Sequence, residues 1–110
     1  MAWLVRDDEV LASLDVAASS RERRRGLLGR DGIDGALLLR GTRSVHTLGM
    51  RFDLDVAYCD ADLAVLDVVR MRRWRLGLPR LRARVVIEAE AGAFERWRLR
   101  AGDQLEVKGA

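Results

Sequence analysis

Residues 54–71 show a regular alternation of side chains, interrupted by one polar turn, and this pattern limits the folds open to the chain. In Leu54–Cys59, apolar side chains recur at every second position on one side, which carries Leu54, Val56 and Tyr58. A period of two residues is typical of a β-strand. The Asp-Ala-Asp sequence at 60–62 predicts a hairpin turn, and residues 63–71 predict the return strand. A fold built on a β-sheet is therefore favoured.

Further short strands are predicted at 3–6, 10–16, 35–40, 81–89 and 104–108. A capping box at 19–22 predicts a short helix over 21–28. A second helical turn is expected at 93–98, where Phe94 and Trp97 stand three residues apart. We therefore expect an α+β fold, with a β-rich, compact and barrel-like sheet of six or seven short strands and two short helices.

The length of 110 residues fits one domain, which we expect to span 1–110. No apolar run approaches the roughly 20 residues needed to cross a bilayer. The N-terminal sequence lacks the basic start and long apolar centre of a secretory signal. One cysteine cannot form an internal disulfide. We therefore expect a soluble, cytoplasmic protein.

Four separated blocks of sequence carry a family resemblance. They are Arg21-x-x-Arg-Arg-Gly-Leu-Leu28, His46-Thr-Leu-Gly-Met-Arg-Phe-Asp-Leu-Asp55, Val85-Val-Ile-Glu-Ala-Glu-Ala-Gly92 and Ala101-Gly-Asp103. In this order and spacing the chain resembles the prokaryotic domain-of-unknown-function family 192 (DUF192), also called uncharacterised protein family 0127 (UPF0127), from about Leu11 to Val107. The resemblance implies a small, mostly β fold with no established enzymatic activity or cofactor, and we expect a bacterial source.

The second block departs from the commoner family pattern. Most relatives carry an aromatic-Trp-Met-Lys-Asn-Thr segment where this chain has His46 to Arg51, so the chain looks like a His-Thr-x-Gly-Met variant branch. A role inferred from the Lys-Asn-Thr version does not transfer to these residues.

His46 is the one side chain whose ordinary pKa lies near neutrality. Arg51, Asp55 and Glu88 would converge on it if the strands at 54–59 and 81–89 faced a common groove, giving an acid, a base and a cation together. The alternative is a structural histidine that bonds to backbone and supports a turn at Gly49. The candidate ligand-binding residues are His46, Thr47, Arg51, Asp55, Glu88 and Arg24.

Other chemistries lack a complete set of residues. One histidine and one cysteine fall short of the three or four protein ligands of a zinc site, so we expect no metal and no cofactor. Cys59 precedes Asp60 and has Asp62 nearby, which would raise its pKa, so a buried, unreactive thiol is expected. Neither a nucleophile elbow nor a phosphate-binding loop is present.

Between Asp67 and Glu88 there are seven arginines and no acid, whereas 53–67 holds five acids and no base. The candidate anion-binding residues are Arg70, Arg72, Arg73, Trp74, Arg75, Arg80, Arg82 and Arg84. Arg80, Arg82 and Arg84 would line one strand face, and Trp74 could stack on a base. In the alternative interpretation, the two segments pair their opposite charges across the sheet, or the arginines protect an edge strand.

Three functional hypotheses follow. The first is a binding or accessory module with a groove near His46, Asp55 and Glu88, for a protein partner or another ligand. The second is binding of nucleic acid or another polyanion through Arg70 to Arg84. The third is a small hydrolase or lyase that uses His46.

Overall fold

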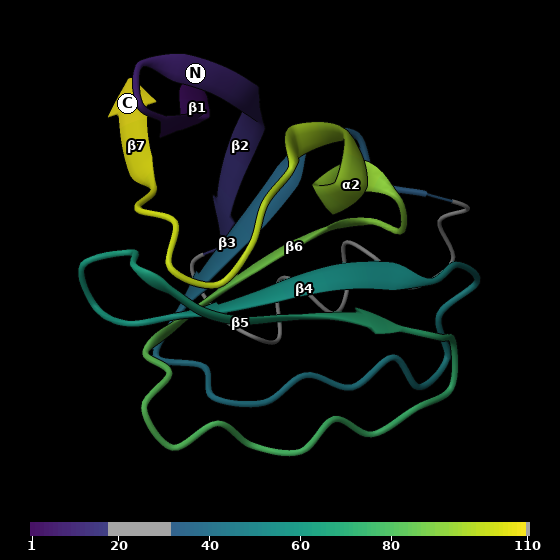
Figure 1. Ribbon diagram of the computed structural model, residues 1–110. Coiled ribbons are helices and arrows are strands. Elements are labelled where there is room, and N and C mark those ends of the chain that lie inside the picture. The colour runs from purple at the N-terminus through teal and green to yellow at the C-terminus, as the bar shows by residue number, and fades with distance from the viewer. Residues whose placement is uncertain (18–31, 110) are drawn as a thin grey trace.

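The computed structural model describes residues 1–17 and 32–109, which form seven strands and one helix (Figure 1). The elements are β1 (Ala2–Arg6), β2 (Glu9–Ala17), β3 (Ala36–Arg40), β4 (Leu54–Cys59), β5 (Val65–Met71), β6 (Val85–Glu90), α2 (Ala93–Trp97) and β7 (Glu106–Gly109). The expected β-rich α+β class is confirmed. The predicted helix at 21–28 lies outside the described residues.

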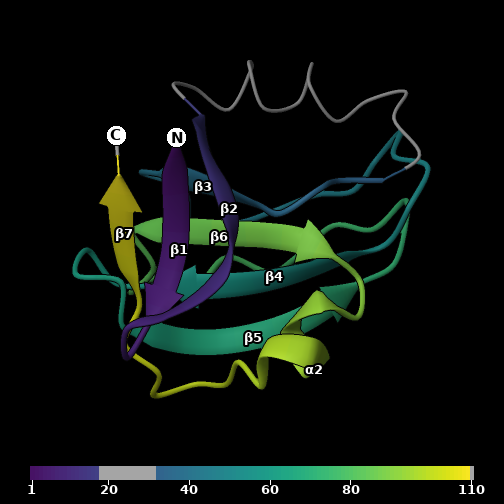
Figure 2. The same ribbon diagram turned by 90° about the horizontal axis from the view of Figure 1, so that it is seen from above.

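The strands form one sheet in the order β5-β4-β6-β3-β2-β1-β7. Only the pair β2–β3 is parallel. Figure 2 shows β7, β1 and β2 crossing β4, β5 and β6 at a steep angle, so the sheet is strongly curled. Its edge strands β5 and β7 do not pair with each other. The segments before them are joined by a bridge between Ala64 and Gln104 and by backbone hydrogen bonds such as Leu105 N to Leu63 O at 3.0 Å. The sheet is thus open, and the barrel-like closure is not confirmed.

The predicted hairpin is present as β4 and β5. Asp60 shapes its turn, because one carboxylate oxygen accepts hydrogen bonds from the backbone N–H groups of Asp62 and Ala64, both at 2.9 Å. The return strand begins at Val65, two residues later than expected, because Leu63 has a left-handed φ of 69°. Local turn chemistry therefore fixes this part of the sheet.

Both faces of β4 are buried. Its alternating side chains therefore point into two different hydrophobic cores, and neither set faces solvent. One face packs with α2 and the C-terminal segment, through Ile87, Phe94 and Leu105. The other face packs under two long loops, which contribute Met50, Phe52 and Ala83 to the second core. In Figure 1, α2 lies above the hairpin and the two loops lie below it.

We call residues 41–53 the supporting loop and residues 72–84 the basic loop. The two loops run side by side along the lower edge of the molecule in Figure 1. Backbone hydrogen bonds connect them at intervals, including Gly77 N to Val45 O at 2.9 Å and Arg80 N to Arg43 O at 2.9 Å. This ladder gives the basic loop a defined path without regular secondary structure.

The strand predicted at 81–89 begins only at Val85, so its first part was wrong. The N–H of Ala83 donates to the carbonyl of Arg80 at 3.0 Å, which closes a turn before the strand. Arg80, Arg82 and Arg84 therefore do not line one strand face.

None of the described helical residues forms a helix long and apolar enough to cross a membrane.

Candidate functional site

The structure does not bring Asp55 and Glu88 together. In the pairing of β4 with β6, Val56 lies opposite Glu88, and Asp55 lies opposite Ala89. Residues opposite each other point to the same face of a sheet, and successive residues point to opposite faces. The two carboxylates therefore lie on different faces of the sheet. The expected groove containing both of them, with His46, is not formed.

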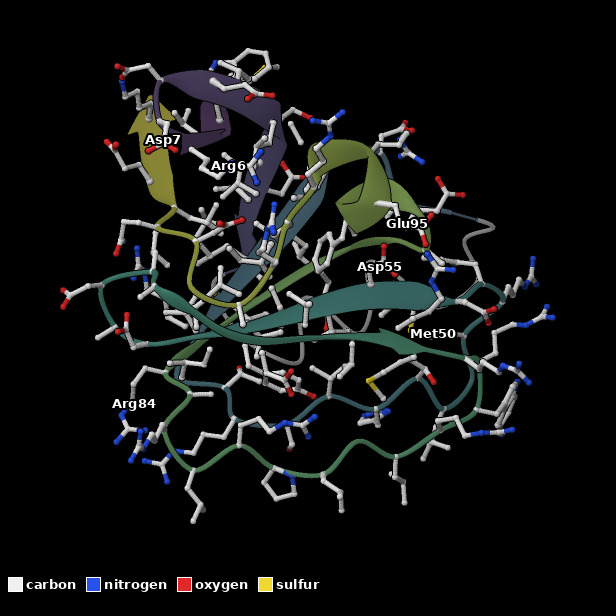
Figure 3. All side chains as sticks on the ribbon, in the orientation of Figure 1. Arg6, Asp7, Met50, Asp55, Arg84 and Glu95 are labelled. Atoms are coloured by element: carbon white, nitrogen blue, oxygen red, sulfur yellow. The ribbon has the colours of Figure 1, made fainter. Side chains whose placement is uncertain are left out.

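Asp55 organises the start of α2. One of its carboxylate oxygens accepts hydrogen bonds from the N–H groups of Gly92 at 2.9 Å and Phe94 at 3.0 Å. The other accepts one from Arg70 Nε at 3.1 Å, which raises the pKa of the Arg70 guanidinium. Figure 3 shows Asp55 directly below the helix, close to Glu95. Because both oxygens are engaged and the side chain is buried, Asp55 acts as a structural carboxylate.

A pocket of about 600 Å³ opens beside this carboxylate, lined by Arg70, Phe94 and Arg98 among others. The polar groups of Asp55 that reach it already have partners.

The other candidate ligand-binding residues lie in or beneath the loops. Glu88 is fully buried on the face that the loops cover. His46 is partly buried in the supporting loop, where it forms a β-bridge with Leu76 of the basic loop. Arg51 lies further along the supporting loop, and its carbonyl accepts a hydrogen bond from the Arg73 guanidinium at 3.2 Å. Arg24 lies outside the described residues.

Thr47 is fully buried between the two loops. Its hydroxyl donates to the carbonyl of Arg72 at 2.5 Å and accepts from the N–H of Arg75 at 2.9 Å. These bonds hold the backbone of the basic loop in place. Thr47 thus supports the backbone that carries two of the candidate anion-binding residues, Arg72 and Arg75.

Three arginines of the 70–84 segment are paired internally. The acidic segment supplies a partner for each of them: Asp55 for Arg70, Asp53 for Arg73 at 3.6 Å and Asp67 for Arg80 at 3.0 Å. Arg70 also lies 3.7 Å from Glu95 of α2. For these three, the alternative of complementary charges is confirmed.

The remaining arginines of the segment form a separate set, which we call unpaired because none of them has an acidic partner among the described residues. Within residues 1–17 and 32–109 no carboxylate lies in salt-bridge range of Arg72, Arg75, Arg82 or Arg84. All four are exposed, and Figure 3 shows Arg84 projecting outward at the lower edge. An anionic partner would meet their charges without displacing an internal ion pair.

Large apolar side chains stand exposed between these arginines. Their exposed fractions are 62% for Trp74, 75% for Leu76, 77% for Leu78 and 78% for Leu81. Clustered exposed apolar groups mark interaction surfaces. The sequence analysis singled out Trp74 but missed the leucines. The available signal was an apolar residue at nearly every second position in a segment that contains Gly77 and Pro79.

Trp74 also adopts a left-handed backbone conformation, with φ of 61°. This conformation is unfavourable for a bulky side chain, and strained residues concentrate at functional sites. The exposed ring gains little from packing in return. Fold stability therefore does not explain a tryptophan at this position.

Cys59 is fully buried, and this burial, aided by the nearby Asp60 charge, raises the pKa of its thiol to about 12. The expectation of a buried, unreactive cysteine is confirmed. No group of three or more potential metal ligands occurs in the described part of the chain.

Comparison with known proteins gives one family. The model of DUF192, described as an uncharacterized ACR, matches residues 3–107. A UPF0127 protein of Pyrococcus horikoshii is 33% identical over 63 residues, which cover 57% of this chain and 55% of the relative. A UPF0127 protein of Thermococcus gammatolerans is 31% identical over 96 residues, which cover 82% of this chain and 63% of the relative. The chain thus spans between about half and two thirds of these archaeal relatives, which do not support the expected bacterial origin.

Two solved structures share the fold. A putative transcription regulator from Sinorhizobium meliloti 1021 superposes with a TM-score of 0.79 at 18% identity, covering 96% of this chain and 91% of the other. A protein of unknown function from Novosphingobium aromaticivorans superposes with a TM-score of 0.77 at 17% identity, covering 96% of this chain and 82% of the other. At such low identity these similarities concern the fold alone.

Proposed function

The chain belongs to DUF192, an uncharacterized family, and from that premise we propose that it is a binding module whose basic loop docks on an anionic lipid surface. The observation that carries this proposal is the mixture in one loop of four unpaired arginines and four exposed apolar side chains. This proposal restricts the polyanion hypothesis to one kind of partner, an anionic lipid surface. It replaces the hypothesis of a binding groove near His46.

Estimated binding free energies indicate that neither the arginines nor the leucines alone would hold the protein on a membrane. A basic residue near an anionic membrane contributes about 1 kcal/mol, so four unpaired arginines give about 4 kcal/mol and a Kd of ~1 mM. Burying three leucines adds about 1.5 kcal/mol each, which brings the total to about 8 kcal/mol and the Kd to ~1 μM. Useful affinity therefore requires both the charges and the leucines.

The leucines also favour lipid over nucleic acid. Single-stranded nucleic acid is held by arginines and by aromatic side chains on which bases stack. Trp74 suits that role, but Leu76, Leu78 and Leu81 have no π-face to offer a base. An anionic bilayer accommodates all of them, because its headgroups attract arginine and its acyl region accepts tryptophan and leucine.

Flotation with lipid vesicles tests the proposal. We expect the protein to float with vesicles that contain phosphatidylglycerol and not with phosphatidylcholine alone, and to dissociate in high salt. The double variant Leu76→Ser with Leu78→Ser should lose most binding without any change of charge. The matched control is Val10→Ser with Val16→Ser, which removes two exposed apolar side chains from β2.

The charge contribution has its own pair of variants. Arg82→Gln with Arg84→Gln should weaken flotation, whereas Arg96→Gln with Arg100→Gln, which changes the net charge equally in and after α2, should not. Absence of flotation, or flotation unaffected by loss of the leucines, would overturn lipid docking. Tight binding of single-stranded RNA without vesicle binding would assign the basic loop to nucleic acid instead.

A further inference from the structure

A second concave site lies where β5 meets the basic loop. This pocket has a volume of about 410 Å³, and Tyr58 of β4 forms part of its wall. Four of its lining residues are arginines and none is acidic: Arg70, Arg72, Arg75 and Arg80. An anion would therefore be the favoured occupant.

Tyr58 is fully buried, and among the described residues its hydroxyl has no hydrogen-bond partner. Buried polar groups in proteins are nearly always paired, so an exception calls for an explanation. Gly77, which also lines the pocket, closely approaches this hydroxyl: a Cβ added there would lie 3.3 Å from the Tyr58 oxygen. The hydroxyl is thus a donor placed at the wall of a basic pocket.

The surrounding arginines are of two kinds. Arg80 is fixed, because it binds Asp67 and its guanidinium lies 4.6 Å from the centre of the Tyr58 ring. Arg70 is held by Asp55 in the same way. Arg72 and Arg75 have no carboxylate partner among the described residues, and Thr47 fixes their backbone. Two anchored and two available guanidinium groups therefore surround one pocket.

We infer that this pocket binds a phosphate group, with the Tyr58 hydroxyl donating to one phosphate oxygen and Arg72 and Arg75 binding the others. Guanidinium groups match phosphate oxygens in pairs, and a tetrahedral anion accepts hydrogen bonds from several directions at once. Burial raises the pKa of Tyr58, so its hydroxyl keeps the proton that it donates. The phosphate belongs either to a soluble phosphate compound or to a lipid headgroup. Only the second source rests on the proposed function.

Calorimetric titration with inorganic phosphate, in buffers of equal ionic strength made with chloride, tests the site. We expect wild type to bind phosphate, and Tyr58→Phe and Arg72→Gln each to weaken the Kd about tenfold. The control Arg96→Gln changes an exposed arginine of α2 that lies outside both the pocket and the basic loop, and it should bind phosphate as wild type does. Failure of wild type to bind phosphate, or equal affinity in Tyr58→Phe, would overturn the site.

A vesicle arm identifies the source of the phosphate. Preference for phosphatidic acid over phosphatidylglycerol that disappears in Tyr58→Phe would support the site with a lipid headgroup as its ligand. Unchanged flotation of Tyr58→Phe, together with its weaker phosphate binding, would support the site with a soluble ligand. Phosphate binding without any flotation would contradict the lipid docking alone, so the two proposals fail separately.

Discussion

Two of the hydrogen bonds between Thr47 and Arg75 run in opposite directions. The N–H of Thr47 donates to the carbonyl oxygen of Arg75 at 2.9 Å, and the N–H of Arg75 donates to the Thr47 hydroxyl at 2.9 Å. The same hydroxyl donates to Arg72. One buried side chain thus fixes the part of the basic loop that carries two unpaired arginines.

Replacing Thr47 with valine should lower the free energy of unfolding by about 2 kcal/mol. The change keeps the shape but leaves the N–H of Arg75 and the carbonyl of Arg72 without their partner. Urea denaturation measures the effect. Thr47→Ser retains the hydroxyl and should lose less than half as much. Equal losses in both variants would show that the methyl group, not the hydroxyl, is what matters.

Gly77 should not tolerate a larger residue. A Cβ there would lie 2.7 Å from the carbonyl oxygen of Val45, whose position the backbone ladder fixes. We expect Gly77→Ala to destabilise the protein by about 2 kcal/mol in thermal or urea denaturation. The control is Gly32→Ala, where the nearest atom would be a Glu90 carboxylate oxygen at 3.5 Å. A neutral Gly77→Ala would mean that the two loops can separate at little cost.

Asp55→Asn should cost about 3 kcal/mol of stability. An amide cannot replace a carboxylate that accepts from two backbone N–H groups and one guanidinium, because its NH₂ group must face one of these donors. Chemical denaturation tests this expectation. Glu95→Gln removes only an exposed contact with Arg70 at 3.7 Å and should change stability by less than about 0.5 kcal/mol. Similar small effects for both changes would refute the structural role of Asp55.

Trp74→Gly should raise the stability of the protein and weaken its binding to vesicles. Glycine accepts a φ of 61° without strain, so the free energy of unfolding should rise by about 1 kcal/mol while vesicle flotation weakens. Trp74→Phe keeps both the strain and an apolar ring, so it should resemble wild type in both measurements. A loss of stability in Trp74→Gly would show that the indole packs on the fold.

Cys59 should make stability fall at high pH. The pKa of its thiol is raised from 9.0 to about 12 in the folded protein. Below pH 9 the thiol is neutral in both states, but at higher pH only the unfolded chain releases the proton. Between about pH 8 and about pH 10, wild type should therefore lose about 1.4 kcal/mol more than Cys59→Ala in urea denaturation. The pKa of Tyr58 is also raised, but this lowers the stability of both proteins equally at high pH, so the difference between them reports Cys59 alone. Parallel pH profiles of the two proteins would contradict the raised pKa of Cys59.

Much of the local structure could be predicted from the sequence. The β4–β5 hairpin follows from the alternation at 54–59 and from Asp60, and the contact of Phe94 with Trp97, whose ring centroids lie 5.4 Å apart, follows from helical spacing. The candidate groove could not be predicted in the same way. It required the register of β4 against β6, and these strands are separated by the 25 residues 60–84. That register places Asp55 and Glu88 on opposite faces of the sheet.

By itself, the sequence determined which segments extend, where the hairpin turns and that the arginines concentrate in one segment, because these properties depend on neighbours a few residues away. Only the tertiary structure decided that both faces of β4 are buried, that Thr47 supports the basic loop, and which arginines remain without an acid. These outcomes depend on contacts between segments distant in sequence. No local sequence pattern indicates whether an aspartate such as Asp67 will form an ion pair with a particular arginine.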